Sequence, residues 1–543
     1  MPTSPRRRLS ACLILLALSL LVVVPVSVTT TPASARAAAA LSVSPHHYIG
    51  GQRLTFEGNI GARGERRVKL QINLSRPGDE WKDVDDFRGA TTQRDGDFSF
   101  GYTAPSMFGI RMRVASGRLS TPPITFQADS QDLVVEAHSG EYGLDPGQVL
   151  AGQPFRIEVD TTPNSDGERD LARRTDLPAP AYQGRVLTLQ ERTVEQVGVP
   201  SYTDQWTTLG TTTTNAQGKG VFTDVETGQD TVYRVRQEAW NEGGSKIGWY
   251  PSFPTYVDVV SGAGAAPTRA TTGTVTPRTT TGTLPVTFKD VASTTAAETF
   301  QWRPSLWDYG WTYGESLTDG PSRGSDPVGH WVDWADGTGR AAKHNGGVML
   351  DTQRQNSDED KFDGSRGSTA ITMRDNPMRY GRWEVRMRTK STEDHAYDPH
   401  VLIELVPDAP ANYHCGAQTI TVADFTPHGS NVQVGARALA GAKEWTRTVR
   451  DAWTNGSSTA FGVEVTKRHI SWFIEGRVVA TVKSRAAVSD VPMTLRLSLA
   501  GRGLDEVNRT QAISDWQRGY SLERGAQKTN GAPLQVRTHD GGC

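Results

Sequence analysis

The sequence predicts an all-β protein in which two small β-sandwiches precede one larger jelly-roll sandwich. Short segments of alternating apolar and polar residues recur along the whole chain, and such alternation is typical of half-buried strands. Gly and Pro are abundant, with 55 and 30 residues, which favours many turns between short strands. At 543 residues the chain is too long for one ordinary domain, so about three domains are expected.

Residues 1–40 have the three parts of a signal peptide. Arg6, Arg7 and Arg8 precede the apolar run ACLILLALSLLVVVPVSV, and small residues at A-x-A spacing follow near residues 35–40. A retained membrane anchor is the alternative, because the run is nearly long enough to span a bilayer. Since no second run of this kind follows, cleavage would leave a secreted, extracellular protein that has no membrane contact and could associate with a cell wall.

A weak internal repeat covers the next part of the chain, with one copy in residues 41–130 and the other in 131–260. Each copy contains short alternating segments, one tryptophan (Trp81 or Trp206) and a Gly-containing turn before an aromatic strand. The two copies resemble bacterial immunoglobulin-like domains. We expect both tryptophans to pack in or beside a core; sugar-stacking platforms are the alternative. Residues 261–290 are rich in Thr, Gly and Pro and predict a linker.

The rest of the chain, 291–543, is again rich in strand patterns. In YGRWEVRMR, Trp383 and Val385 point to one side of a strand while Glu384 and Arg386 point to the other. HISWFIEGRVVATV predicts a hairpin, because two apolar segments flank a Glu-Gly turn. Many antiparallel strands in one domain of this size predict two stacked sheets.

Four segments of this domain carry a family resemblance. YGRWEVRMRTK, VLIELVPD, FGVEVTKRHISWFIEGRVVATV and VPMTLRLSLAG occur in this order. Together they resemble the family-16 glycoside hydrolases, which include laminarinases and lichenases, over roughly residues 295–525. The resemblance implies a concanavalin-like sandwich whose concave sheet forms a cleft for a polysaccharide.

The family's signature, E-x-D-x-x-E, places its carboxylates along one cleft strand. A retaining glycosidase needs a nucleophilic carboxylate and a carboxylic acid about 5–5.5 Å apart. Positions i and i+2 share a face of the strand, but position i+5 falls on the opposite face. A β-bulge must therefore correct the alternation.

In this chain the signature lies in CGAQTITVADF, residues 415–425, and most of its acids are missing. The frame that keeps apolar residues between the signature positions places Thr419, Thr421 and Asp424 at them. The frame one residue earlier contains no carboxylate. A threonine hydroxyl is a poor nucleophile without an activating base, so the ordinary retaining reaction is expected to be lost.

Glu404 in VLIELVP stands where the family usually carries a tryptophan into the cleft. Together with Asp424 it could form a wider, inverting-type pair, for which separations of about 6.5–9.5 Å suffice. The alternative is a Glu404 that bonds to a sugar hydroxyl or to a neighbouring arginine such as Arg386.

Five further residues are candidates for the glycan cleft. Trp307 and Trp311 belong to FQWRPSLWDYGWTYGES, and we expect them to be exposed for stacking on sugar rings. Trp334 lies in HWVDWADG, just before AAKHNGGVMLDTQ, which resembles the family's early strand running toward the cleft. Glu384 and Arg386 occupy the polar side of YGRWEVRMR and are expected in the same cleft.

Cysteine and histidine positions add few constraints. Cys415 and Cys543 are predicted to form a disulfide in an exported protein, with two free thiols as the alternative. Neither has metal-ligand spacing, and the acidic stretch SDEDKFDG does not fit a regular calcium loop. We therefore expect no metal and no cofactor. His414 and His428 flank the 415–425 segment and could act as acid or base, or could be ordinary loop residues.

These observations lead to three functional hypotheses. The first is a secreted protein that binds an extracellular or cell-wall polysaccharide with weak or no hydrolysis. The second is an active endo-glycosidase that cleaves O-glycosyl bonds in a β-glucan or galactan with Asp424 and Glu404. The third is a non-catalytic envelope protein that makes protein contacts. The net charge of −2, with mixed signs, does not favour a nucleic-acid partner, and we expect a monomer.

Overall fold

The computed structural model describes most of the chain after the predicted signal peptide. It describes residues 38–539 apart from 74–79, 85–86, 107–108, 127, 130, 132, 142, 164–181, 193–205, 262–293, 304, 312–329, 336–338, 345–346, 353–367, 375, 393–396, 410–411, 413–416, 439–442, 454–455, 502–506 and 523–529. Residues 1–37 of the predicted signal peptide, nearly all of the predicted linker, both candidate disulfide cysteines, His414 and the acidic stretch lie outside these residues.

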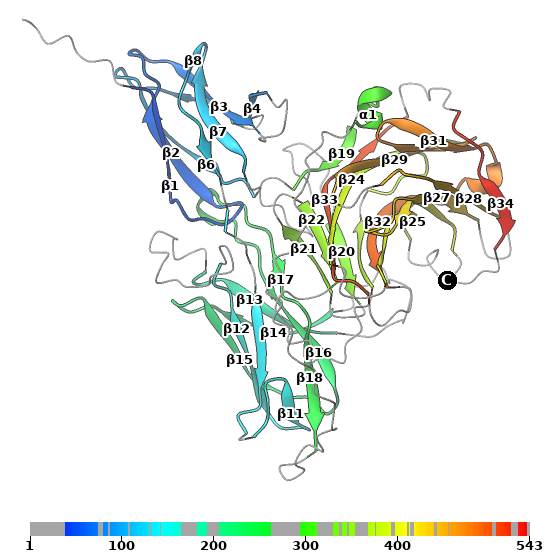
Figure 1. Cartoon of the computed structure of the whole chain (residues 1–543). Coiled ribbons are helices and arrows are strands. Elements are labelled where there is room, and N and C mark those ends of the chain that lie inside the picture. Colours follow the sequence, from blue (N-terminus) through cyan, green and yellow to red (C-terminus); the bar gives the residue numbers. More distant parts are fainter. Residues whose placement is uncertain are drawn as a thin grey trace, which may run out of the picture.

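Two small β-sandwiches come first (Figure 1). The sheets of the first contain β1 (Ala40–Ser44), β2 (Arg53–Asn59) and β6 (Asp97–Thr103), and β4 (Lys82–Asp83), β3 (Arg67–Asn73), β7 (Arg111–Ser116), β8 (Leu119–Ser120), β5 (Ala90–Thr91) and β9 (Ile124–Thr125). The sheets of the second contain β10 (Val134–His138), β12 (Phe155–Asp160) and β15 (Lys219–Val225), and β11 (Gln148–Leu150), β18 (Thr255–Val260), β16 (Thr231–Gln237), β13 (Val186–Arg192), β14 (Trp206–Thr213) and β17 (Tyr250–Pro251).

The larger sandwich contains two sheets, which we call the β24 sheet and the β26 sheet. In strand order, the β24 sheet has β21 (Arg340–His344), β22 (Gly347–Asp351), β33 (Thr510–Tyr520), β24 (Gly381–Ser391), β29 (Thr459–Val465), β30 (Ile470–Ile474) and β31 (Arg477–Val482), and β19 (Ser305–Tyr309) pairs with β33. The β26 sheet has β20 (His330–Ala335), β23 (Thr369–Arg374), β32 (Met493–Ala500), β25 (His400–Pro407), β26 (Thr419–Phe425), β27 (Val432–Arg437), β28 (Lys443–Val449) and β34 (Gln535–Thr538). The prediction of an all-β protein with a large two-sheet sandwich is confirmed.

The core of the larger sandwich lies between these two sheets. Trp383 and Val385 of β24 face it from one side, and Ile420 and Val422 of β26 face it from the other. Burying each large apolar side chain stabilises the fold by about 1.5–3 kcal/mol. Polar residues that alternate with them therefore lie on the two outer faces of the sandwich, which point in opposite directions.

The predicted Glu-Gly hairpin joins β30 to β31. Glu475 and Gly476 form its turn with φ values of 50° and 70°. Two successive residues with positive φ give a turn whose twist matches that of the flanking strands. The helix α1 (Ala296–Thr299) lies against the outer face of the β24 sheet, because Glu384 of β24 accepts a hydrogen bond from the backbone N–H of Ala296 at 2.5 Å.

The second small sandwich is in direct contact with the larger one. Arg234 of β16 forms an ion pair with Asp333 of β20. Arg340 of β21 donates to the carbonyl oxygen of Pro251 at 3.0 Å and lies over the ring of Phe253. The predicted linker therefore joins two units that also share a polar interface.

Candidate functional site

A β-bulge in β26 brings the signature positions onto one face. Thr419 and Thr421 alternate with core residues, as in a regular strand. The register then shifts between Thr421 and Asp424, and the two consecutive residues Val422 and Ala423 both contact the core. Asp424 consequently returns to the outer face of the β26 sheet, beside the two threonines.

Asp424 is held by a histidine of the neighbouring strand. His400 begins β25, and its Nδ1 lies 2.6 Å from Oδ1 of Asp424. The side chain of Asp424 is 8% exposed, while that of His400 is 30% exposed. A carboxylate that orients a solvent-accessible imidazole can take part in proton transfer.

The pattern of the sequence contained a signal for this pair. Residues 400, 402 and 404 share one face of β25, so Glu404 on the outer face implies that His400 lies there too. We missed His400 because the pairing register of β25 with β26 cannot be read from either segment alone. The structure aligns Leu402 with Asp424, which brings the ring of His400 within reach of that carboxylate.

Glu404 lies directly opposite Thr421 and is bound to an arginine. Arg496 of β32 donates to Oε2 of Glu404 from Nη2 at 2.5 Å and from Nε at 3.2 Å. The alternative of an arginine-bound Glu404 is therefore the one observed, but its partner is Arg496 and not Arg386. Two donors of the guanidinium therefore occupy Oε2 of Glu404.

A second histidine–aspartate pair ties the loop after β26 to the segment before β25. Nδ1 of His428 lies 2.8 Å from Oδ1 of Asp398, whose Oδ2 accepts from the backbone N–H of His428 at 3.0 Å. Asn508 also donates to Oδ1 of Asp398 at 2.7 Å. His428 is therefore part of a structural network at one end of the site.

Trp307 and Trp311 are not on a ligand-binding face, which corrects the prediction that they are exposed. Their side chains are 1% and 0% exposed, and both belong to the core between the sheets. Trp307 lies on β19, which pairs with β33 and points this ring inward; at Gly519 of β33, a Cβ would lie 2.3 Å from the Trp307 ring. The indole of Trp311 donates to Gln517 at 2.8 Å.

Glu384 and Arg386 also lie away from Asp424, which corrects their assignment to the same cleft. Their alternation with core residues was predicted correctly, but β24 belongs to the opposite sheet. Burial raises the pKa of Glu384 to about 7, although the N–H groups of Ala296 and Ala297 act in the other direction. The carboxyl group therefore supports α1 at neutral pH in a partly protonated form.

Trp334 shares the outer face of the β26 sheet with Asp424, at the far edge. It alternates with the core residue Trp331 and is 5% exposed. The cross-strand register runs from Trp334 through β23, β32 and β25 to Asp424, so four strand spacings of about 4.8 Å separate the two positions. The structure thus brings Thr419, Thr421, Asp424 and Glu404 together and places Trp334 roughly 19 Å away.

Comparisons with known proteins concern the larger sandwich. The chain matches no protein-family model and no curated protein. Its structure is similar to the catalytic domain of an endo-1,3-β-glucanase (laminarinase) from Thermotoga petrophila, at a TM-score of 0.31 and 14% identity over 40% of this chain and 98% of that one. A laminarinase from a Flavobacterium species has a TM-score of 0.30 and 12% identity over 40% and 100%.

A β-glucanase from Bacillus licheniformis is similar to the same degree, at a TM-score of 0.28 and 16% identity over 35% of this chain and 92% of that one. These matches cover less than half of this chain but nearly the whole of each solved structure. At such TM-scores they do not establish a function, which has to come from the side chains.

Within the described ranges, no group of three or more His, Cys, Asp or Glu residues is arranged to hold a metal ion. Over the same ranges, no helix has the length and apolar character needed to cross a membrane.

Proposed function

We propose that this is a secreted glycan-recognising protein that binds a polysaccharide on the outer face of the β26 sheet and does not hydrolyse it by the retaining mechanism. The observation that carries the proposal is the set of side chains around the bulge. A threonine stands at the position of the nucleophile, and the nearest carboxylates are held by His400 and Arg496. The face therefore has several polar side chains close together but lacks the pair of carboxyl groups that retaining cleavage requires.

The retaining reaction requires two carboxyl groups about 5–5.5 Å apart, one as nucleophile and one as acid. Thr419 offers only a hydroxyl, which is a weak nucleophile unless a base removes its proton. Glu404 lies opposite Thr421, but the guanidinium of Arg496 occupies its Oε2. Within β26, Asp424 is the only residue with a carboxyl group.

Sugar binding is supported by the chemistry of the same face. Threonine hydroxyls, the ring of His400 and the Glu404–Arg496 pair supply donors and acceptors for sugar hydroxyls. Trp334 lies on the same side of the sheet but is buried and four strands away, so the proposal rests on these polar groups.

Hydrolysis by an inverting mechanism is the second candidate, and one observation favours it. Glu404 pairs with Thr421 and Asp424 pairs with Leu402, so the two carboxylates are diagonal neighbours across β25 and β26. Such diagonal positions are about 7–8 Å apart. Two carboxyl groups on the same face at this spacing are compatible with the separation of about 6.5–9.5 Å that an inverting pair uses. The partly exposed His400 could then exchange a proton with Asp424.

One experiment separates these two functions. The purified protein is offered β-1,3-glucan, mixed-linkage glucan and galactan, and calorimetric binding and reducing-end release are measured in parallel. We expect binding to at least one polymer without release, and a loss of affinity of about tenfold in Glu404→Gln, which removes one charge-assisted contact. Glu158→Gln serves as the control, because Glu158 forms an ion pair with Arg156 in the second small sandwich.

Turnover that disappears in Asp424→Asn or Glu404→Gln would replace the binding function with the inverting hydrolase. Absence of binding to every polymer would refute both. Export, an extracellular or cell-wall location, immunoglobulin-like character of the two small sandwiches and a monomeric state are part of the same proposal. Sizing of the culture-medium protein tests the location and the monomeric state together.

A further inference from the structure

A tryptophan of the opposite sheet bonds to the bulge in β26. Nε1 of Trp472, on β30, donates a hydrogen bond to the carbonyl oxygen of Thr421 at 2.9 Å. This oxygen lies at the point where the register between β26 and β27 shifts. The Trp472 ring is fully buried in the core. An indole can only donate, so its N–H requires an acceptor of this kind when it is buried.

The bulge decides which residues of β26 face outward. In a regular strand that keeps Thr419 and Thr421 outside, Ala423 would follow on the outer face and Asp424 would enter the core. Burying a carboxylate there without a partner would cost several kcal/mol. The bond from Trp472 stabilises the irregular backbone at the one place where the alternation has to change.

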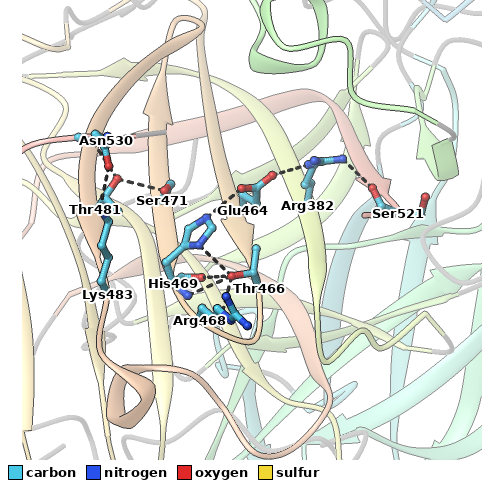
Figure 2. Close-up of polar contacts among 11 residues, drawn as sticks. Arg382, Glu464, Thr466, Arg468, His469, Ser471, Thr481, Lys483, Ser521 and Asn530 are labelled. Atoms are coloured by element: carbon cyan, nitrogen blue, oxygen red, sulfur yellow. Dashed lines mark hydrogen bonds and ion pairs between the residues drawn. The ribbon is translucent and has the colours of Figure 1, made fainter. Parts of the chain in front are cut away.

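Trp472 itself is held in place from the other side of β30. Its neighbour Ser471 bonds to Thr481 of β31 at 3.0 Å and lies opposite Glu464 of β29. Glu464 accepts from Arg382 of β24 at 2.7 Å, and the four residues form a row across four strands on the outer face (Figure 2). This row contains no residue of β26. It therefore holds the backbone of β30 beside Trp472 independently of the bulge.

We propose that Trp472 is the positioning residue of the candidate site: its indole N–H fixes the bulge that presents Asp424 to His400 on the outer face. The consequence for glycan binding rests on the proposed function, whereas the consequence for the Asp424–His400 hydrogen bond does not. Trp472 belongs to the β24 sheet, whereas the other members of the site all belong to the β26 sheet.

The test compares Trp472→Phe with Trp311→Phe. Trp311 is a matched control, because it is fully buried in the same core and also loses one indole hydrogen bond, to Gln517. Two properties are measured by NMR: the ring nitrogen shifts of His400, assigned with His400→Gln, and the exchange rates of the Val422, Ala423 and Asp424 amides. We expect altered His400 shifts and about tenfold faster exchange of these amides only in Trp472→Phe, as loss of one hydrogen bond allows.

Equal His400 shifts and equal exchange in the two variants would overturn the proposal. If Trp472→Phe does not fold, benzothienylalanine at position 472 keeps the ring shape and removes only the N–H, and the same two readouts apply. Binding of soluble β-1,3-glucan is measured last. Weaker binding in Trp472→Phe extends the inference to the ligand. A protein that binds no glucan in any form refutes the proposed function while the NMR result still decides the role of Trp472.

Discussion

The two outer faces of the larger sandwich differ in how far solvent reaches the charged pairs on them. On the β24 sheet, Arg382 and Glu464 are both 2% exposed, and Arg382 also donates to the carbonyl oxygen of Ser521 at 2.8 Å, in the segment that follows β33. On the β26 sheet, the ring of His400 beside Asp424 is 30% exposed. The Arg382–Glu464 pair is sealed from solvent and stabilises the fold, whereas the ring of His400 remains within reach of a ligand.

Burial alone does not determine the pKa of a carboxylate on the sealed face. Burial would raise the pKa of Glu464, but hydrogen bonds from His469 and Arg382, together with their charges, hold it below its ordinary value. Glu384 is equally buried and has no cation in hydrogen-bonding contact among the described residues, and its pKa rises to about 7. The two carboxylates should therefore affect stability at opposite ends of the pH range.

The largest effect is expected from breaking the sealed ion pair. Arg382→Ala leaves Glu464 buried with only His469 as its charged partner, and we expect the free energy of unfolding to fall by about 3–5 kcal/mol. Urea denaturation at pH 7 measures this change. The double variant Arg382→Met/Glu464→Leu should recover most of the loss, because an apolar pair of similar volume leaves no charge unpaired. A loss below about 1 kcal/mol in the single variant would mean that the face is not sealed.

A smaller and pH-dependent effect is expected at Glu384. Its pKa is about 7 in the folded protein against 4.5 ordinarily, so between these values the folded state binds the proton more tightly. Stability therefore falls as the pH rises from about 4.5 to 7. Glu384→Gln removes this term, and we expect its stability relative to the unaltered protein to be greater at pH 8 than at pH 4 by up to about 3 kcal/mol.

Urea denaturation of both proteins at the two pH values checks this prediction. Glu158→Gln, at a partly exposed ion pair of the second small sandwich, is the control for a general effect of charge removal. A difference between Glu384→Gln and the unaltered protein that stays constant with pH would contradict the assignment of the proton to Glu384.

Sequence patterns predicted the faces of strands well, but not the sheets to which the strands belong. Alternation in YGRWEVRMR correctly separates Trp383 from Glu384. The same pattern would arise on either sheet, because a strand's own residues do not identify its neighbours. For this reason Glu384 was expected beside Asp424, whereas the strand order places β24 and β26 on opposite sides of the core.

The site was predictable where local spacing was sufficient and unpredictable where it depended on long-range register. The i, i+2, i+5 spacing of Thr419, Thr421 and Asp424 required a bulge, and the register of β26 with its neighbours contains one. The partners of this site, His400 and Trp472, come from segments that are distant in sequence or in the other sheet. Their roles depend on how strands pair and how sheets stack, which are properties of the folded chain.

The smallest effect on stability is expected at His400. A variant of this residue also tests whether the β26 face differs from the sealed face in serving ligand binding. His400→Ala removes a partly exposed partner from Asp424, and we expect a loss of about 1.5–2 kcal/mol, the lower part of the range for a hydrogen bond to a charged group. Affinity for the bound polysaccharide should nevertheless fall more than in Arg382→Ala, although that variant is less stable. Thermal denaturation and calorimetric binding on the same samples provide both numbers. If His400→Ala destabilises the protein as much as Arg382→Ala and leaves affinity unchanged, the Asp424–His400 pair is structural, and the β26 face resembles the sealed face more than a binding site.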